Sequence, residues 1–167
     1  MIRVMTTWGY CALLLFSAIA LVTSPAQADK LVPGTGDMLS PLSEHKPFAE
    51  AHIILQISDG AEVHYNSALD IANNLMKHYG GQDRVDIEVI AFGAGIGMLY
   101  ARENENAERI ASLMEHGVRF YLCGNTLDTI ERKEGKQPEI LPGVTIVQTG
   151  VAFMLSEVKR GYLLVHL

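Results

Sequence analysis

The stretch Gly117-Val-Arg-Phe-Tyr-Leu-Cys-Gly-Asn-Thr-Leu127 places a strand, a turn and the start of a helix next to one another. Residues 118–122, Val-Arg-Phe-Tyr-Leu, are mostly apolar and have the length of a strand. The glycine and polar residues of 123–126 predict the turn at which that strand ends. A short helix is expected from there to about Gly135. Cys123 therefore stands where a strand passes into a helix.

Apolar runs of strand length also occur on either side of this stretch, and helical patterns separate them. The further strands are expected at residues 52–57, 86–92, 143–148 and 162–165. Apolar residues recur at helical spacing in residues 68–79, 107–114 and 151–160. Strands that are apolar on both faces and alternate with helices are typical of a parallel sheet covered on both sides. The sequence thus predicts an α/β fold of three layers, α/β/α, around a five-stranded, mainly parallel sheet.

The turns that follow the strands are expected to lie along one edge of this sheet. Right-handed crossovers place each strand-to-helix turn of a parallel sheet at the carboxyl ends of its strands. Ligands of open parallel sheets bind at that edge. The turns it collects are residues 58–61, 93–97, 123–126 and 148–150.

Length and composition fit one globular domain and exclude several classes of protein. The chain has 167 residues, of which 49% are hydrophobic, and a formal net charge of −6. It is too short for two full cores and too apolar for intrinsic disorder. Phosphate binding needs clustered Lys and Arg, so an acidic chain of this kind is not expected to bind nucleic acid.

The N-terminus has the features of a cleaved secretory signal peptide, residues 1–28. Arg3 supplies a positive charge, residues 10–22 form an apolar run, and Ala26-Gln-Ala28 matches a cleavage site. The run of 13 residues is short for a bilayer span, which needs about 20, and an uncleaved anchor is the alternative. Cleavage after Ala28 leaves 12 basic and 19 acidic residues, a charge of −7. We expect a periplasmic protein without stable membrane association.

The segment after the cleavage site, residues 29–50, is predicted to be an extended arm ahead of an α/β domain at residues 51–167. The segment is rich in Pro, Gly and Ser and shows no sustained period. Three prolines interrupt any helix within it, because proline lacks the backbone donor that a helix needs. They are Pro33, Pro41 and Pro47.

Cys123 is the principal candidate for chemistry. The other cysteine, Cys11, lies in the predicted signal peptide, so the processed chain keeps a single thiol. Backbone N–H groups and the positive end of a helix behind Cys123 would stabilise a thiolate, which is the nucleophile of sulfur and disulfide chemistry. The alternative is a buried, inert cysteine, since free cysteines are among the most buried residues. No Cys-x-x-Cys is present, which excludes a two-thiol cycle within one chain.

The residues expected to support Cys123 come from two turns. Gly124, Asn125 and Thr126 follow it directly, and Asn125 or Thr126 is a candidate cap for the helix behind. Asp59, in the first turn of the same edge, is a candidate hydrogen-bond acceptor or a cap of the first helix. His64 follows that turn and is a candidate general base.

Metal and nucleotide sites are not predicted. The histidines, at positions 45, 52, 64, 78, 116 and 166, show no recognised metal spacing. Gly93-x-Gly95-x-Gly97 follows a strand but lacks the spacing of a dinucleotide loop. A tight turn beside the site accounts for these glycines better than phosphate binding does. We therefore expect no metal and no cofactor.

The chain carries an ordered series of stretches: His52–Gly60, Asn73–Gly80, Val85–Gly93, Gly117–Leu127, Leu141–Val144 and Gly161-Tyr162. Together they resemble the DsrE/DsrF family, and specifically its exported single-domain members. The resemblance covers about residues 51–167. It implies a three-layer α/β fold with a five-stranded, mainly parallel sheet, and association into trimers, hexamers or hetero-hexamers.

The resemblance also implies a role for one cysteine. Several members are sulfur carriers, in which a cysteine accepts sulfane sulfur as a persulfide and passes it on. Cys123 matches the cysteine at the end of the third strand in many members, and Asn125 and Thr126 match the turn without an assigned role. The best-understood carriers act in the cytoplasm, so the identity of their partners does not transfer to a chain with a signal peptide.

Two classes of function follow from the sequence. The first is a periplasmic sulfur carrier that takes sulfane sulfur on Cys123 and exchanges it with a donor or acceptor protein. The second is a non-catalytic module that binds a small molecule or a protein and has an inert cysteine. A homo-oligomer, trimer or hexamer, is expected in both cases.

Overall fold

The computed structural model describes residues 44–167, so the predicted signal peptide and most of the predicted arm lie outside the described residues. The strands are β1 (Ala51–Ile57), β2 (Val85–Ala91), β3 (Arg119–Cys123), β4 (Thr145–Val147) and β5 (Leu163–His166). The helices are α1 (Glu62–Tyr79), the 3-10 helix η1 (Gly93–Leu99), α2 (Ala107–Glu115), α3 (Gly124–Glu134) and α4 (Gly150–Lys159). Within residues 44–167, no helix combines the length and apolar character that a membrane span requires.

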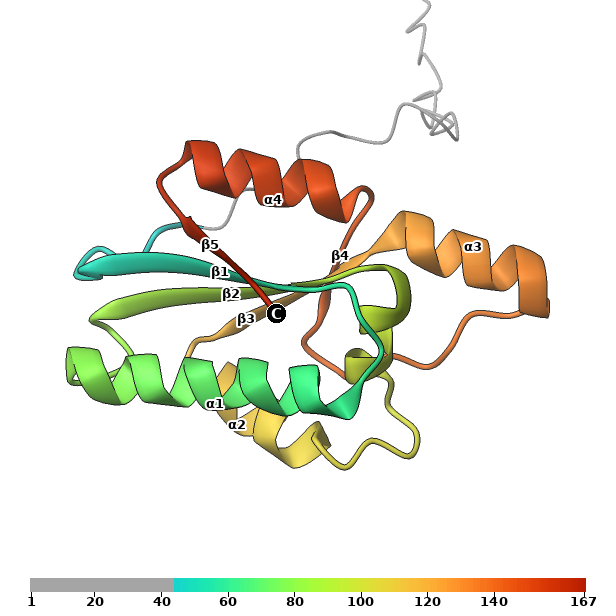
Figure 1. The fold of residues 1–167 in the computed structure, drawn as a ribbon, viewed down its shortest axis with the longest axis horizontal. Coiled ribbons are helices and arrows are strands. Elements are labelled where there is room, and N and C mark those ends of the chain that lie inside the picture. The colour runs from blue at the N-terminus through green and yellow to red at the C-terminus, as the bar shows by residue number, and fades with distance from the viewer. Residues whose placement is uncertain (1–43) are drawn as a thin grey trace, which may run out of the picture. The chain divides into compact units, whose positions relative to one another are not determined.

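The strands form one five-stranded sheet in the order β4-β3-β2-β1-β5, and every pairing is parallel (Figure 1). The predicted α/β fold with a five-stranded, mainly parallel sheet is confirmed, and the sheet is parallel throughout. β2 lies at its centre, and each of its seven residues is buried. The carboxyl ends of β3 and β4 are neighbours, which brings the turns after these two strands together.

Helices cover both faces of the sheet. Figure 1 shows α1 and α2 on one face and α4 on the other, while α3 extends from the carboxyl ends of the strands. The face under α1 and α2 holds the larger core, which includes Leu55, Leu69 and Phe120. The face under α4 holds a smaller core around Ile90 and Phe153. The sheet thus separates two cores of unequal size.

The α4 face of β2 differs from the predicted strand, which was expected to be apolar on both faces. Asp86 and Glu88 are both fully buried there. Arg119 of β3 reaches both carboxylates, with Nη2 at 2.6 Å from Asp86 Oδ1 and 3.2 Å from Glu88 Oε1. The Tyr162 hydroxyl donates to Asp86 Oδ2 at 2.9 Å. These contacts explain how buried carboxylates are tolerated, because buried charges need ionic and hydrogen-bonding partners.

The segment after β2 forms the 3-10 helix η1 instead of the expected tight turn. The glycines are required by close packing rather than by a simple reversal of the chain. A Cβ on Gly95 would lie 2.4 Å from the Ile57 carbonyl oxygen, and Gly93 has a φ of 58°. A side chain at either position would clash or strain the backbone. Seven residues is long for a 3-10 helix, and packing against β1 holds this one in place.

Candidate functional site

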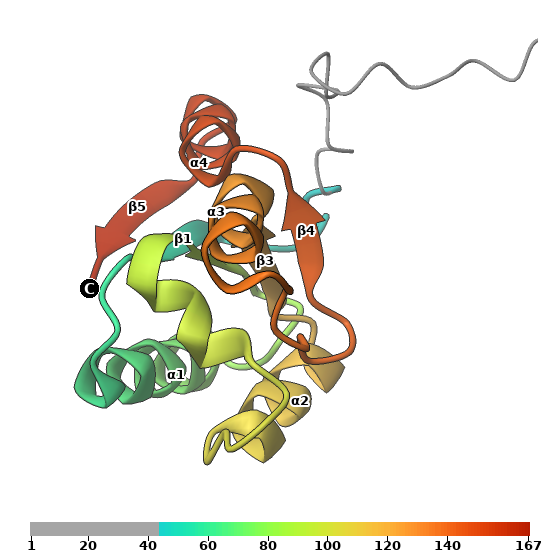
Figure 2. The same cartoon turned by 90° about the vertical axis from the view of Figure 1, so that its right-hand side faces the viewer.

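Cys123 is the last residue of β3 and precedes the first residue of α3. Its thiol is free, and the residue is 7% exposed. Its side chain lies on the α4 face of the sheet, beside Val147 of β4, which is its partner in the parallel pairing. Figure 2 looks onto the carboxyl ends of the strands, where α3 begins. The thiol therefore lies at the sheet edge that the sequence predicts, just beneath the surface.

A backbone amide from a second helix points at the sulfur. The N–H of Gly150, the first residue of α4, donates to Cys123 Sγ across 3.3 Å. The thiol in turn points toward the Gln148 carbonyl oxygen at 3.8 Å. The first N–H groups of a helix have no partner within the helix and carry its partial positive charge. The sulfur thus accepts a hydrogen bond from the first residue of α4.

Glycine at position 150 is what allows this approach. A Cβ added there would lie 3.0 Å from Cys123 Cβ and 3.6 Å from Cys123 Sγ. Real Cβ atoms rarely come so close to other carbon atoms, so a larger residue would push the start of α4 away from the sulfur. The close contact between α4 and β3 thus depends on the absence of a side chain at this position.

Hydrogen bonds tie the turn after β3 to the turn after β4. The Asn125 N–H donates to the Gln148 carbonyl at 3.0 Å, and Asn125 Nδ2 donates to Thr149 Oγ1 at 3.1 Å. Gln148 Nε2 donates back to Asn125 Oδ1 at 2.7 Å and to Asp128 Oδ2 at 3.2 Å. Thr149 precedes Gly150, so these bonds fix the amide that faces the sulfur.

The predicted caps of the helix behind Cys123 are wrong. α3 begins at Gly124, Cys123 occupies its N-cap position, and no side chain caps it. Asn125 and Thr126 lie inside the first turn and bond elsewhere. Thr126 Oγ1 accepts the Gly93 N–H at 3.1 Å, which links α3 to η1. Both residues connect the turns of the sheet edge to one another.

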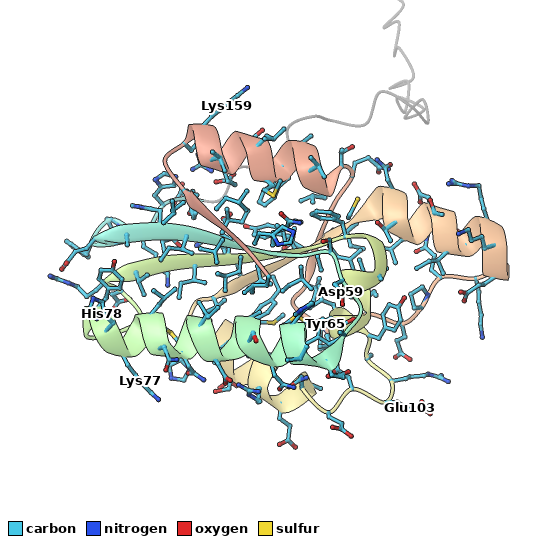
Figure 3. All side chains as sticks on the ribbon, viewed as in Figure 1. Asp59, Tyr65, Lys77, His78, Glu103 and Lys159 are labelled. Atoms are coloured by element: carbon cyan, nitrogen blue, oxygen red, sulfur yellow. The ribbon has the colours of Figure 1, made fainter. Side chains whose placement is uncertain are left out.

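Asp59 and His64 form a separate pair at the carboxyl end of β1, which β2 separates from β3. His64 Nδ1 lies 3.2 Å from Asp59 Oδ1, and both side chains are substantially exposed. Asp59 also accepts the Ala61 N–H at 2.7 Å, but no side chain caps α1, in contrast to the prediction. Figure 3 shows Asp59 near Tyr65 at the start of α1. The polar contact of His64 is thus with Asp59 and not with Cys123.

Three residues beside the sulfur were not predicted as site residues, namely Gln148, Thr149 and Gly150. The sequence predicted that these residues lie at the carboxyl edge of the sheet. It did not predict the strand order, so it could not show that β4 lies beside β3. The glycine at the start of a helix directly after a strand was the available signal. Among residues 44–167, no cluster of three or more His, Cys, Asp or Glu side chains is arranged to hold a metal ion.

The fold and the site define a class: a small α/β protein with a five-stranded parallel sheet and a cysteine at its carboxyl edge between two helix starts. This chain belongs to the DsrE/DsrF-like family, whose model matches residues 52–158. Among solved structures it is similar to MTH1491 from Methanobacterium thermoautotrophicum, a protein of unknown function. The identity is 27% and the TM-score 0.61, over 71% of this chain and 100% of that one.

The fold is also similar to that of YchN from E. coli. The identity is 17% and the TM-score 0.54, over 70% of this chain and 99% of that one. At this identity the likeness shows the α/β fold with its five-stranded sheet and nothing about function. No curated protein matches this chain.

Proposed function

We propose that this protein is a sulfur carrier that holds sulfane sulfur as a persulfide on Cys123. The observation that supports the proposal most strongly is the Gly150 N–H at 3.3 Å from Cys123 Sγ. An amide held at a helix start stabilises an anionic sulfur, which is the reactive form of a thiol. Membership of the DsrE/DsrF-like family is consistent with this role.

The loading step is a thiol exchange in which atoms and electrons balance. The Cys123 thiolate attacks the outer sulfur of a hydropersulfide R–S–SH, or the corresponding sulfur of a polysulfide. A new S–S bond forms on Cys123, the S–S bond of the hydropersulfide breaks, and R–S⁻ leaves with the electron pair. The proton stays on the transferred sulfur, which gives Cys–S–SH. The step needs no external oxidant or reductant.

The unloading step reverses this exchange with a second thiol. An acceptor thiolate attacks the outer sulfur of the persulfide, becomes R′–S–SH and regenerates the Cys123 thiolate. The Gly150 N–H faces Cys123 Sγ, which carries the negative charge before loading and after unloading. The bonds of Asn125 to the Gln148 carbonyl and to Thr149 keep that amide in place through the cycle.

The test is to incubate the purified protein with inorganic polysulfide and to measure its intact mass. We expect an adduct of about 32 Da, one sulfur atom, that a small thiol removes. The Cys123→Ser variant keeps the shape of the side chain without the nucleophile, so it should gain no mass. Absence of the adduct in the native protein, or its persistence in Cys123→Ser, would contradict the proposal.

The second candidate is a binding module in which Cys123 is inert. The low exposure of Cys123, 7%, is the observation that favours it. Under this candidate the folded protein gains no sulfur from polysulfide, and Cys123→Ala leaves ligand or partner binding unchanged. The mass experiment on folded protein therefore distinguishes the two candidates.

We also propose that the chain forms a homo-oligomer, a trimer or a hexamer. The outer face of α4 supports this, since Val151, Leu155 and Val158 recur at i, i+4 and i+7 and are 44%, 52% and 38% exposed. Contiguous exposed apolar surface is a common feature of protein–protein interfaces. Light scattering should give the mass of a trimer or hexamer, and Leu155→Glu should reduce it. The mass of a single chain at micromolar concentration would overturn the proposal.

A further inference from the structure

The segment of residues 44–50 is fastened to the amino end of the sheet, opposite the edge that holds Cys123. The backbone N–H of Lys46 donates to Asp86 Oδ2 at 3.0 Å. The Lys46 ammonium donates to the carbonyls of Gln82 and Val85, at 2.8 and 3.2 Å. The Glu50 N–H donates to the Arg84 carbonyl at 2.8 Å. These contacts hold the segment along the start of β2.

His45 anchors the beginning of this segment in a cluster of rings. Its ring centroid lies 4.6 Å from that of His52 on β1 and 5.2 Å from that of Tyr162, and the rings of His52 and Tyr162 are 5.4 Å apart. Within residues 44–167, Nε2 of His45 is shielded from solvent and has no hydrogen-bond partner. Protonation of His45 would therefore leave a buried N–H without an acceptor. It would also place a positive charge beside a second histidine, His52.

The charged groups that face His45 come from each element packed against it. They are His52 from β1, Asp86 from β2, and Glu157 and Arg160 from α4, beside the Tyr162 hydroxyl. Asp86 is bonded to Arg119, and Glu157 accepts two bonds from Arg160 Nη1, at 2.9 and 2.8 Å. Both carboxylates are thus already paired with guanidinium groups, which reduces their attraction for a cation at His45.

We propose that residues 44–50 form a pH-sensitive latch in which neutral His45 docks the segment and protonated His45 releases it. The segment connects the α/β domain to the residues that precede position 44. The latch therefore sets how firmly residues 44–50 are held to the amino end of the sheet. It is independent of the chemistry proposed for Cys123.

The direction of the pH dependence follows from the surroundings of His45. Burial lowers the pKa of His45, Arg160 and His52 lower it further, and the opposing effects of Asp86 and Glu157 are smaller. A histidine whose pKa is lowered by docking favours the docked state above its ordinary pKa of about 6.5. As the pH falls below that value, the free energy of docking becomes less favourable. It stops changing once the pH is below the pKa of His45 in the docked segment.

Amide hydrogen exchange on the purified protein measures this directly. The protection factor of the Lys46 amide, which bonds to Asp86, should be several-fold lower at about pH 5.5 than at about pH 7.5. The protection of Val89, at the centre of β2, should fall by no larger a factor, because global unfolding frees the same histidine. The observed exchange rate is compared with the intrinsic rate of the unfolded chain at each pH. This comparison removes the direct effect of pH on the exchange reaction itself.

The variant His45→Phe keeps a ring against His52 and Tyr162 and removes the titrating group. Its Lys46 protection should be independent of pH over the same range. His78→Phe is the matched control, since His78, in the last turn of α1 (Figure 3), also contacts a tyrosine ring, at 5.0 Å, but is not among the groups that face His45. It should behave like the unmodified protein. Constant Lys46 protection in the unmodified protein, or an equal fall in His45→Phe, would overturn the proposal.

Discussion

Replacing Arg119 with methionine is expected to lower the free energy of unfolding by about 3–5 kcal/mol. The carboxylate of Asp86 is fully buried, and Arg119 Nη2 lies 2.6 Å from it. Burial alone lowers the pKa of Arg119, but Asp86, Tyr162 and Glu88 together raise it above the ordinary value. Removal of the guanidinium leaves the Asp86 carboxylate without a cation in a site that water does not reach, which is the costly way to break a buried ion pair.

Denaturant unfolding at neutral pH measures this loss, and Arg102→Met is the matched control. Arg102 pairs with Glu139 at 3.2 Å, but both side chains are largely exposed, so its loss should cost less than about 1 kcal/mol. A loss at position 119 no larger than the loss at position 102 would show that the buried cluster does not depend on Arg119.

Replacing Gly150 with alanine is expected to slow the loading of sulfur onto Cys123 by about tenfold to a hundredfold. The added Cβ would lie 3.0 Å from Cys123 Cβ, so the start of α4 must move and the bond from the Gly150 N–H to the sulfur is lost. A hydrogen bond to a charged group contributes about 1.5–3 kcal/mol, which corresponds to this range of rates.

The rate at which the mass increases after addition of polysulfide measures this effect. Lys159→Ala is the control, because Lys159 is an exposed residue in the last turn of the same helix and lies outside the apolar stripe of Val151, Leu155 and Val158. It should load sulfur at the rate of the unmodified protein. Denaturant unfolding of both variants separates a local effect on the sulfur from a general loss of structure. An unchanged loading rate in folded Gly150→Ala would show that this amide does not assist the reaction.

The strands and the fold class could be predicted because their signals are local. The apolar runs around Ile54, Val89 and Leu122 are the length of strands, and the amphipathic pattern of α1 is continuous. The burial of Asp86 and Glu88 could not be predicted in the same way. Alternating polar residues in a strand usually indicate a face exposed to water. Their partner Arg119 is recognisable only when β3 is known to lie beside β2.

The position of Cys123 at the carboxyl edge followed from the order strand, turn, helix, but its surroundings did not. Gly150 and Gln148 reach the sulfur because β4 pairs with β3, and the order of strands cannot be read from a single sequence. For the same reason, His64 was a candidate base for the thiol, although β2 separates its strand from β3. Export through residues 1–28 stays a prediction, because these residues lie outside those that the structure describes.

The central claim is that the sulfur of Cys123 reacts as a nucleophile while the protein is folded. The most direct measurement compares the rate of sulfur uptake from polysulfide, followed by intact mass, in native buffer and in denaturant at the same pH. A reactive site predicts uptake in native buffer at least as fast as in the unfolded chain, because the Gly150 N–H donates a hydrogen bond to the sulfur only in the folded protein. Uptake that occurs only after unfolding would show that the thiol is sealed in the core, and would contradict the claim.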